Sequence, residues 1–126
     1  MGQSYTFVLE VPRHTMEDLA LNLGGFESIQ GTSSKALGQL IERVIMDGLE
    51  EHLGEADDFT VTPSPQGFVV EIPREALEDV AINLYAPNVE SIDGATSEEL
   101  SGLMSEIVMA GLEEYVDDCE FKVRPA

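Results

Sequence analysis

Two short segments of the chain alternate between hydrophobic and polar residues. They cover residues 7–11 and 68–72, and each begins with phenylalanine. Alternate side chains of a strand point to the same face, so each segment predicts a strand with one buried face. Pro12 and Pro73 follow directly, and proline is favoured in the first turn of a helix.

Hydrophobic residues spaced three and four apart follow each of these strands and predict helices. Four helices are expected, over residues 13–23, 37–53, 74–84 and 100–116. Thr96 with Glu99 has the spacing of a capping box, and Ser33 or Ser34 offers a cap to the first long helix. Each half of the chain therefore contains a short helix followed by a longer one.

The second half of the chain repeats the first, which has to be recognised before single motifs are interpreted. The matching segments are 7–23 with 68–84, 27–29 with 90–92, 46–51 with 109–114, and 59–63 with 121–125. The last pair alternates again and predicts a closing strand in each half. The repeated unit is therefore β-α-α-β.

These patterns predict an α+β fold built from tandem duplicated β-α-α-β units. The two repeats cover approximately residues 5–63 and 66–125, and the connection between them is too short for a flexible linker. We expect a single domain over residues 1–126, with pseudo-twofold symmetry and a four-stranded antiparallel sheet packed with four helices.

Gly48 and Gly111 lie at matching positions inside the two long helices. Glycine within a helix costs about 1 kcal/mol relative to alanine, so a packing reason is expected. We predict that the long helices approach each other closely at these glycines. The alternative is that a recent duplication copied a harmless glycine.

The charge of the chain is strongly negative and narrows the classes of partner. Of its 126 residues 25 are acidic and 6 basic, which gives a net charge of −19 and a pI near 4.1. Such a surface repels nucleic-acid phosphates, because affinity for the duplex comes largely from Lys and Arg. The remaining explanations are adaptation to high salt, a surface for cations or a basic partner, and mimicry of DNA.

The sequence gives no positive sign of catalysis or of a cofactor. The single cysteine and the two histidines have no metal-ligand spacing, and no P-loop, dinucleotide fingerprint or nucleophile elbow is present. No hydrophobic run is long enough to span a bilayer, and no leader opens the chain, so a cytoplasmic protein is expected. We name no catalytic and no cofactor-binding residue.

Acidic residues gather at and just after the ends of both long helices. The candidates are Glu50, Glu51, Asp57, Asp58, Glu113, Glu114, Asp117 and Asp118. The negative end of the helix dipole makes anions unfavourable there, so another interaction should favour them. Ca²⁺ or Mg²⁺ bound weakly by these carboxylates, a basic partner, or plain solvation in high salt would each do so.

The order strand, short helix, long helix, with residues 40–45 (LIERVI) in the long helix, resembles the ribbon-helix-helix repressors. That resemblance would imply a paired strand that enters the major groove. The strand side chains that would face the bases are Thr6, Val8 and Glu10 in the first copy. The second copy offers no basic residue there either, and each unit adds a closing strand.

We therefore interpret the chain as a non-enzymatic acidic protein-interaction or regulatory module. Its alternatives are a weak divalent-cation binder, a DNA mimic, and a ribbon-helix-helix-like regulator without a basic DNA-binding surface. A protein partner is expected, and neither a membrane nor direct nucleic-acid contact is. The sequence leaves a homo-oligomer open.

Overall fold

The computed structural model describes residues 4–24, 33–54, 59–65, 67–85, 88, 91–117 and 119–126. The first half contributes β1 (Ser4–Glu10), α1 (Arg13–Leu19), the π-helical turn η1 (Ala20–Gly24), α2 (Ser34–Leu53) and β2 (Thr60–Ser64). The second half contributes β3 (Gly67–Pro73), α3 (Arg74–Tyr85), α4 (Ser97–Leu112) and β4 (Lys122–Pro125). The predicted α+β class is confirmed.

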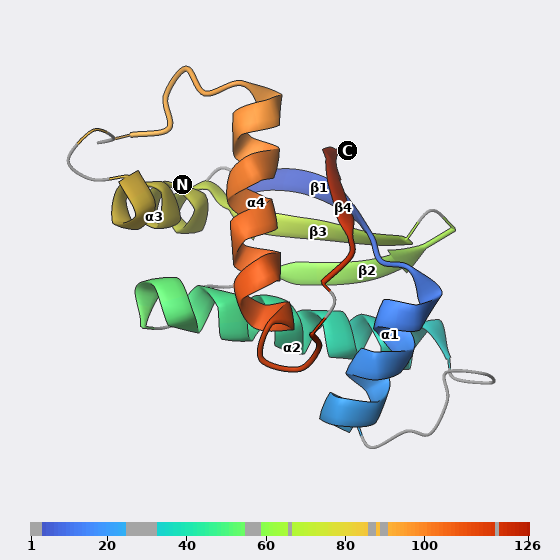
Figure 1. Cartoon of the computed structure of the whole chain (residues 1–126). Coiled ribbons are helices and arrows are strands. Elements are labelled where there is room, and N and C mark those ends of the chain that lie inside the picture. Colours follow the sequence, from blue (N-terminus) through green and yellow to red (C-terminus); the bar gives the residue numbers. More distant parts are fainter. Residues whose placement is uncertain are drawn as a thin grey trace.

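Strands from both halves form one four-stranded antiparallel sheet with the order β2-β3-β1-β4. Each helical connection leads from a central strand to an edge strand and passes over the strand between them, as in a split β-α-β arrangement. Figure 1 shows α4 passing in front of the strands and crossing α2, with α3 and α1 on the two flanks. The predicted antiparallel sheet with four helices is confirmed.

The strand register has the same spacing in both halves of the sheet. Val8 pairs with Val69, which is its own match in the sequence repeat, at the centre of the β1–β3 ladder. On the outer sides, Thr62 of β2 pairs with Val69 and Arg124 of β4 pairs with Val8. Adding 61 to a β1 residue and subtracting 62 from its β4 partner gives a pair of the β2–β3 ladder. Every pair of the β1–β4 ladder therefore has a counterpart between β3 and β2.

The hydrophobic core lies between the sheet and the helices, as the alternation of the strands predicts. Phe7 and Leu9 point into it from β1, whereas the neighbouring Thr6 is exposed. The largest fully buried side chains are Leu9, Leu19, Ile41, Ile45, Leu49, Ile72, Leu77, Met104, Ile107 and Leu112. They come from both halves of the chain.

Two helix ends differ from the sequence prediction. The last helix ends at Leu112, four residues before the predicted end. The N–H groups of Glu114 and Tyr115 bond to the carbonyls three residues before them, at 3.4 and 2.9 Å, and tighten the chain into a turn. Val116 stays buried there. Leu84 continues the hydrophobic spacing of the helix predicted over residues 74–84 but is exposed, since the last turn of α3 projects beyond α4 (Figure 1).

Hydroxyl caps fix the starts of both long helices. Ser33 caps α2 by accepting a 3.2 Å hydrogen bond from the Ala36 N–H. Thr96 and Glu99 form the predicted capping box at α4, each side chain accepting from the other residue's N–H at 3.1 Å. Within the described residues, none of the helices combines the length and apolarity that crossing a membrane requires.

Candidate functional site

The long helices α2 and α4 cross at their two glycines. A Cβ built on Gly48 would overlap the backbone carbonyl oxygen of Ile107, and a Cβ on Gly111 would overlap that of Val44. The two contacts are exchanged by a shift of 63 residues, because Val44 matches Ile107 in the repeat as Gly48 matches Gly111. Any larger residue at either position requires the helices to move apart.

Two asparagines hold the chain where the long helices end. The Asn22 amide donates to the carbonyl oxygen of Tyr115, and the Asn83 amide donates to that of His52. The carbonyl of His52 lies in the last turn of α2 and that of Tyr115 in the turn after α4, where the backbone has no helical partner for it, so these amides supply one. Each contact joins one half of the chain to the other. Asn22 matches Asn83 in the repeat and His52 matches Tyr115, so the second contact repeats the first with the halves exchanged.

One polar network links α2 to the turn after α4 and has no counterpart in the other direction. The carboxylate of Asp47, only 9% exposed, accepts from the Tyr115 hydroxyl and lies 3.4 Å from the Arg43 guanidinium. Burial and the hydrogen bond to Asp47 raise the pKa of Tyr115 above its usual value of 10.0. At the matching positions, Asp47 is replaced by alanine and Tyr115 by histidine.

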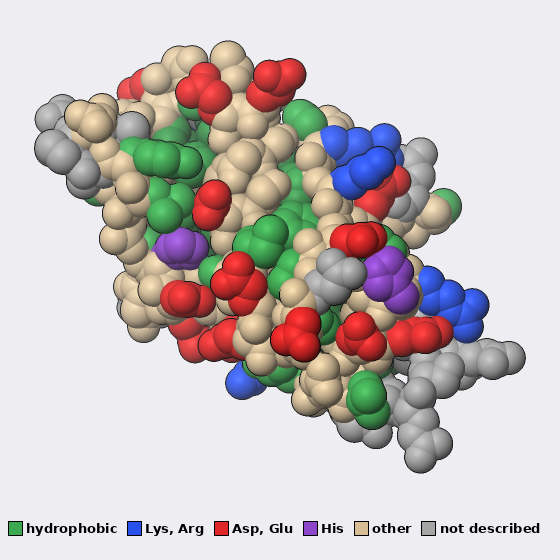
Figure 2. Space-filling model, viewed as in Figure 1, with side chains coloured by type: hydrophobic (Ala, Val, Ile, Leu, Met, Phe, Trp, Pro, Cys, Tyr) green, Lys and Arg blue, Asp and Glu red, His purple; other side chains and the backbone are tan. Residues whose placement is uncertain are grey.

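The acidic candidates near the helix ends are only partly described. Glu50 and Glu51 lie exposed in the last turns of α2, and Glu113, Glu114 and Asp117 lie exposed after α4. Asp57, Asp58 and Asp118 lie outside the described residues. Figure 2 shows a row of Asp and Glu side chains over α2 and the end of α4, in the lower part of the view.

Glu114 is the carboxylate most affected by this crowding. Desolvation raises its pKa above the usual 4.5, and the negative charges of Asp47, Glu51 and Glu50 raise it further. The fold therefore brings the acidic ends of α2 and α4 toward each other. In the part of the chain that the structure describes, no three His, Cys, Asp or Glu side chains form a group that could hold a metal ion.

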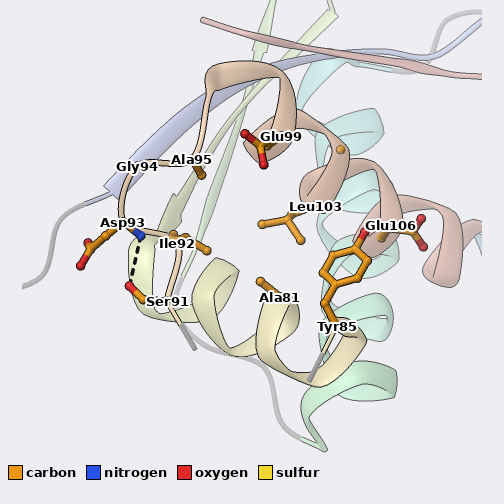
Figure 3. Close-up of a pocket in the computed structure, with 11 residues that line it drawn as sticks. Ala81, Tyr85, Ser91, Ile92, Asp93, Gly94, Ala95, Glu99, Leu103 and Glu106 are labelled. Carbon is orange, nitrogen blue, oxygen red and sulfur yellow. Dashed lines mark hydrogen bonds between the residues drawn. The ribbon is translucent and has the colours of Figure 1, made fainter. Parts of the chain in front are cut away.

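A pocket of about 430 Å³ opens between α3, α4 and the connection that joins them. Its centre is apolar: Ala81, Ile92 and Leu103 point toward one another in Figure 3. The ring of Tyr85, which is 48% exposed, stands beside the side chain of Glu106. Figure 2 shows the apolar surface that remains open between α3 and α4.

Carboxylates line the rim of this pocket. Glu99 and Glu106 come from α4 and are exposed, and Asp93 comes from the connection. Figure 3 shows the Asp93 carboxylate directed away from the pocket, where it pairs with Arg74. Glu99 accepts the Thr96 N–H as part of the helix cap, and Glu106 is the acidic side chain beside the aromatic ring.

Glu78 fixes the wall of the pocket. Its carboxylate accepts the Ile92 N–H at 3.2 Å and the Ser91 hydroxyl at 3.0 Å, and it lies 3.3 Å from the Arg74 guanidinium. The Ile92 and Ser91 hydrogen bonds, together with Arg74, hold the pKa of Glu78 below its usual 4.5. The connection is thereby tied to α3, so Ile92 is placed in the pocket by a carboxylate on the neighbouring helix.

The rim carboxylates of the pocket on α4 are not repeated on α2. Glu99 matches Ala36 and Glu106 matches Arg43, whereas Tyr85 follows the matched segment 68–84 and has no fixed counterpart. Arg43 points to Asp47 instead. The apolar centre is common to both halves, since Ala81 and Leu103 match Ala20 and Leu40.

Sequence reasoning did not identify Tyr85, Glu99 or Glu106 as site residues. It used the repeat to find what the halves share, and it selected acids by their position at helix ends. The differences between the halves carry the missing signal: a residue without charge opposite Glu99, and a reversed charge opposite Glu106.

No protein-family model matches this chain, nor does any curated protein or solved structure. The site is therefore described by its own chemistry.

Proposed function

We propose that this protein is an acidic, non-enzymatic interaction module that holds a basic side chain of a partner protein in the pocket between α3 and α4. The observation that carries the proposal is the combination of an apolar centre, an exposed aromatic ring and rim carboxylates. The two rim carboxylates that α4 contributes have no acidic counterpart on α2, where Ala36 and Arg43 stand at the matching positions.

A lysine or arginine side chain matches this combination in each of its parts. Its aliphatic stem covers apolar surface while its charged head stays near water. In the pocket the stem would lie against Ile92 and Leu103, and the head would reach Glu106. Tyr85 adds a ring face, which attracts a cation by about 0.5–1 kcal/mol at an exposed site.

We also infer that the chain is a tandem duplication folded as one domain with pseudo-twofold symmetry. Three sets of contacts support this: the strand registers around Val8 and Val69, the glycine contacts of α2 and α4, and the two asparagine amides. In each set a contact made by one half is repeated by the other with the residues exchanged. The pocket then marks where the halves have acquired different roles.

The proposal is tested with Nα-acetyl-lysine amide and Nα-acetyl-arginine amide, whose side chains keep their charge. Each is titrated into the ¹⁵N-labelled protein, and binding is followed by the backbone amide chemical shifts. At about 0.15 M KCl, general attraction to the acidic surface is screened beyond roughly 8 Å. We expect the shifts to cluster at Ala81, Tyr85, Leu103 and Glu106. Glu106→Gln should weaken binding about threefold, because an exposed ion pair contributes up to about 1 kcal/mol.

Glu42→Gln is the matched control. Glu42 is exposed on α2 and does not line the pocket, so this variant loses the same charge elsewhere. Equal weakening by Glu106→Gln and Glu42→Gln would show that only net charge matters, and the proposed pocket function would be abandoned.

A further inference from the structure

The sheet has a face turned away from the helices, and its composition differs from that of the whole chain. The side chains opposite the core on β1 and β3 include Val8, which is 9% exposed, and Val69, which is half-buried, and the two pair with each other at the centre. Around them the described strands place two of the six basic residues, Lys122 and Arg124, and two of the 25 acidic ones, Glu10 and Glu71. This face, called the open face below, is neutral on a chain with a net charge of −19.

The remaining positions of the open face are uncharged, and most of them are threonine or serine. Thr6, Thr60 and Thr62 are exposed on it, at the centre and on the β2 edge. Exposed strands in a solvated sheet usually carry charges, which also keep molecules apart. Here three of the four charges lie along the β4 side, where Arg124 lies 3.9 Å from Glu10, and Glu71 lies on β3.

We propose that the open face is the contact surface between two copies of this chain, related by a twofold axis parallel to the strands. Such an axis places β1 of one copy over β3 of its partner and β4 over β2. From the strand registers, Val8 then faces the partner's Val69, and Arg124 faces the partner's Thr62. Glu10 and Glu71 face the partner's Gly67 and Thr6, so no carboxylate meets another.

The absence of net charge on the open face is the reason to choose a second copy as the occupant. Two molecules with a charge of −19 repel each other wherever acidic surfaces meet, and the cost rises as the surfaces approach. The open face lets two copies meet with a neutral, self-matching surface. Aligned packing of two sheets at about 10 Å is a common arrangement for faces of this kind.

The test is sedimentation velocity of the full chain at protein concentrations up to about 1 mM and at about 2 M KCl, where charges are screened within a few ångströms. We expect a monomer–dimer equilibrium for the parent protein. Val69→Glu should weaken dimerisation at least tenfold, because it places a buried charge against the partner's Val8. Gln39→Glu adds the same charge at an exposed position of α2, outside the open face, and should leave the monomer–dimer equilibrium unchanged.

Two further variants keep the test decisive. If circular dichroism shows that Val69→Glu is unfolded, Thr6→Glu replaces it, since Thr6 is exposed in the monomer and faces the partner's Glu71 in the dimer. Thr62→Glu should dimerise at least as well as the parent, because it faces the partner's Arg124. A parent that stays monomeric under these conditions, or dimers that persist in Val69→Glu and Thr6→Glu, would overturn the proposal.

Discussion

The two halves of this molecule share one framework and differ in two places, the polar network of Asp47 with Tyr115 and the pocket between α3 and α4. In both halves a strand leads to a short helix, a long helix and an edge strand, and the glycine and asparagine contacts between the halves match. On the pocket side of its long helix, however, the second half has Glu99 and Glu106 where the first has Ala36 and Arg43. The matching glycines and asparagines, by contrast, are positions at which the halves touch each other.

This difference teaches how position constrains each residue. A glycine at a helix crossing is fixed by two backbones at once, so neither half can change it alone. Glu106 lies exposed on the outer side of α4, where no packing contact fixes its identity. Its counterpart on α2, Arg43, can therefore carry the opposite charge. The pocket lies where such freedom is greatest, which is why the differences between the halves point to function and the matches point to packing.

The largest expected effect comes from the helix crossing. Gly111→Ala places a Cβ on the Val44 carbonyl, and we expect a loss of about 3 kcal/mol, or a fall of roughly 10 °C in Tm. Gly48→Ala should behave in the same way, because its contact with Ile107 is the matching one. Thermal unfolding followed by circular dichroism measures both.

Gly102→Ala is the control for the helix crossing. Gly102 lies on the same helix as Gly111, but a Cβ there meets nothing within 4 Å. Alanine favours a helix by about 1 kcal/mol over glycine, so this variant should raise the Tm by a few degrees. A rise in Tm for Gly111→Ala as well would mean that the crossing tolerates a side chain and that the matching glycines are only a copied feature.

A smaller effect separates the two halves at one matched glutamate. Glu78 binds Ser91, Ile92 and Arg74, whereas its counterpart Glu17 pairs at 2.9 Å with exposed Arg13. Glu78→Gln should lower the Tm by roughly 3 °C, and Glu17→Gln should change it by less than about 1 °C. Equal effects would indicate that the connection is not held more firmly in the second half.

The pH dependence of the Glu78 effect follows from its lowered pKa. The folded protein holds this carboxylate ionised more strongly than the unfolded chain does. The stabilisation is therefore fully present above the unfolded pKa of about 4.5 and is lost as the pH falls through the lower folded pKa. The difference in Tm between the parent and Glu78→Gln should accordingly shrink below about pH 4.

Much of the fold could be predicted because the repeat shows each signal twice. Strand alternation, proline after the strand and the hydroxyl caps at Ser33 and Thr96 are local, and they identify the elements without tertiary information. The end of α4 could not be predicted in this way. Val116 continues the hydrophobic period of that helix and is buried, but a tight turn at Leu112 brings it there.

The pocket could be predicted only in part. Its apolar centre belongs to helical stripes that the sequence displays, yet Ile92 reaches it through hydrogen bonds to Glu78, a residue fourteen positions away. Tyr85 at the end of α3 and Glu106 in the middle of α4 line the same pocket, as Figure 3 shows. Local patterns describe which face of a helix is apolar, and they do not describe which exposed side chains from different helices become neighbours.

The smallest expected effect lies at the acidic helix ends. The raised pKa of Glu114 means that its ionised form is less favourable in the folded protein than in the unfolded chain. Its stabilising contribution is therefore present below the unfolded pKa of about 4.5 and lost as the pH rises through the higher folded pKa. Glu114→Gln removes this repulsion, so at pH 7 and low salt it should raise the Tm by about 1 °C.

The matched control is Glu51→Gln, which changes the counterpart of Glu114 in the first half. If crowding by Asp47, Glu50 and Glu51 is the cause, Glu51→Gln should also stabilise the protein, and the double variant should gain less than the sum because each removes the same repulsion. About 1 M KCl should reduce both effects by screening. Gains that persist in high salt would exclude repulsion as their source.

A rise in the parent's Tm with millimolar Ca²⁺ or Mg²⁺, lost in both variants, would instead identify these helix ends as the weak cation surface that their position in the sequence predicts.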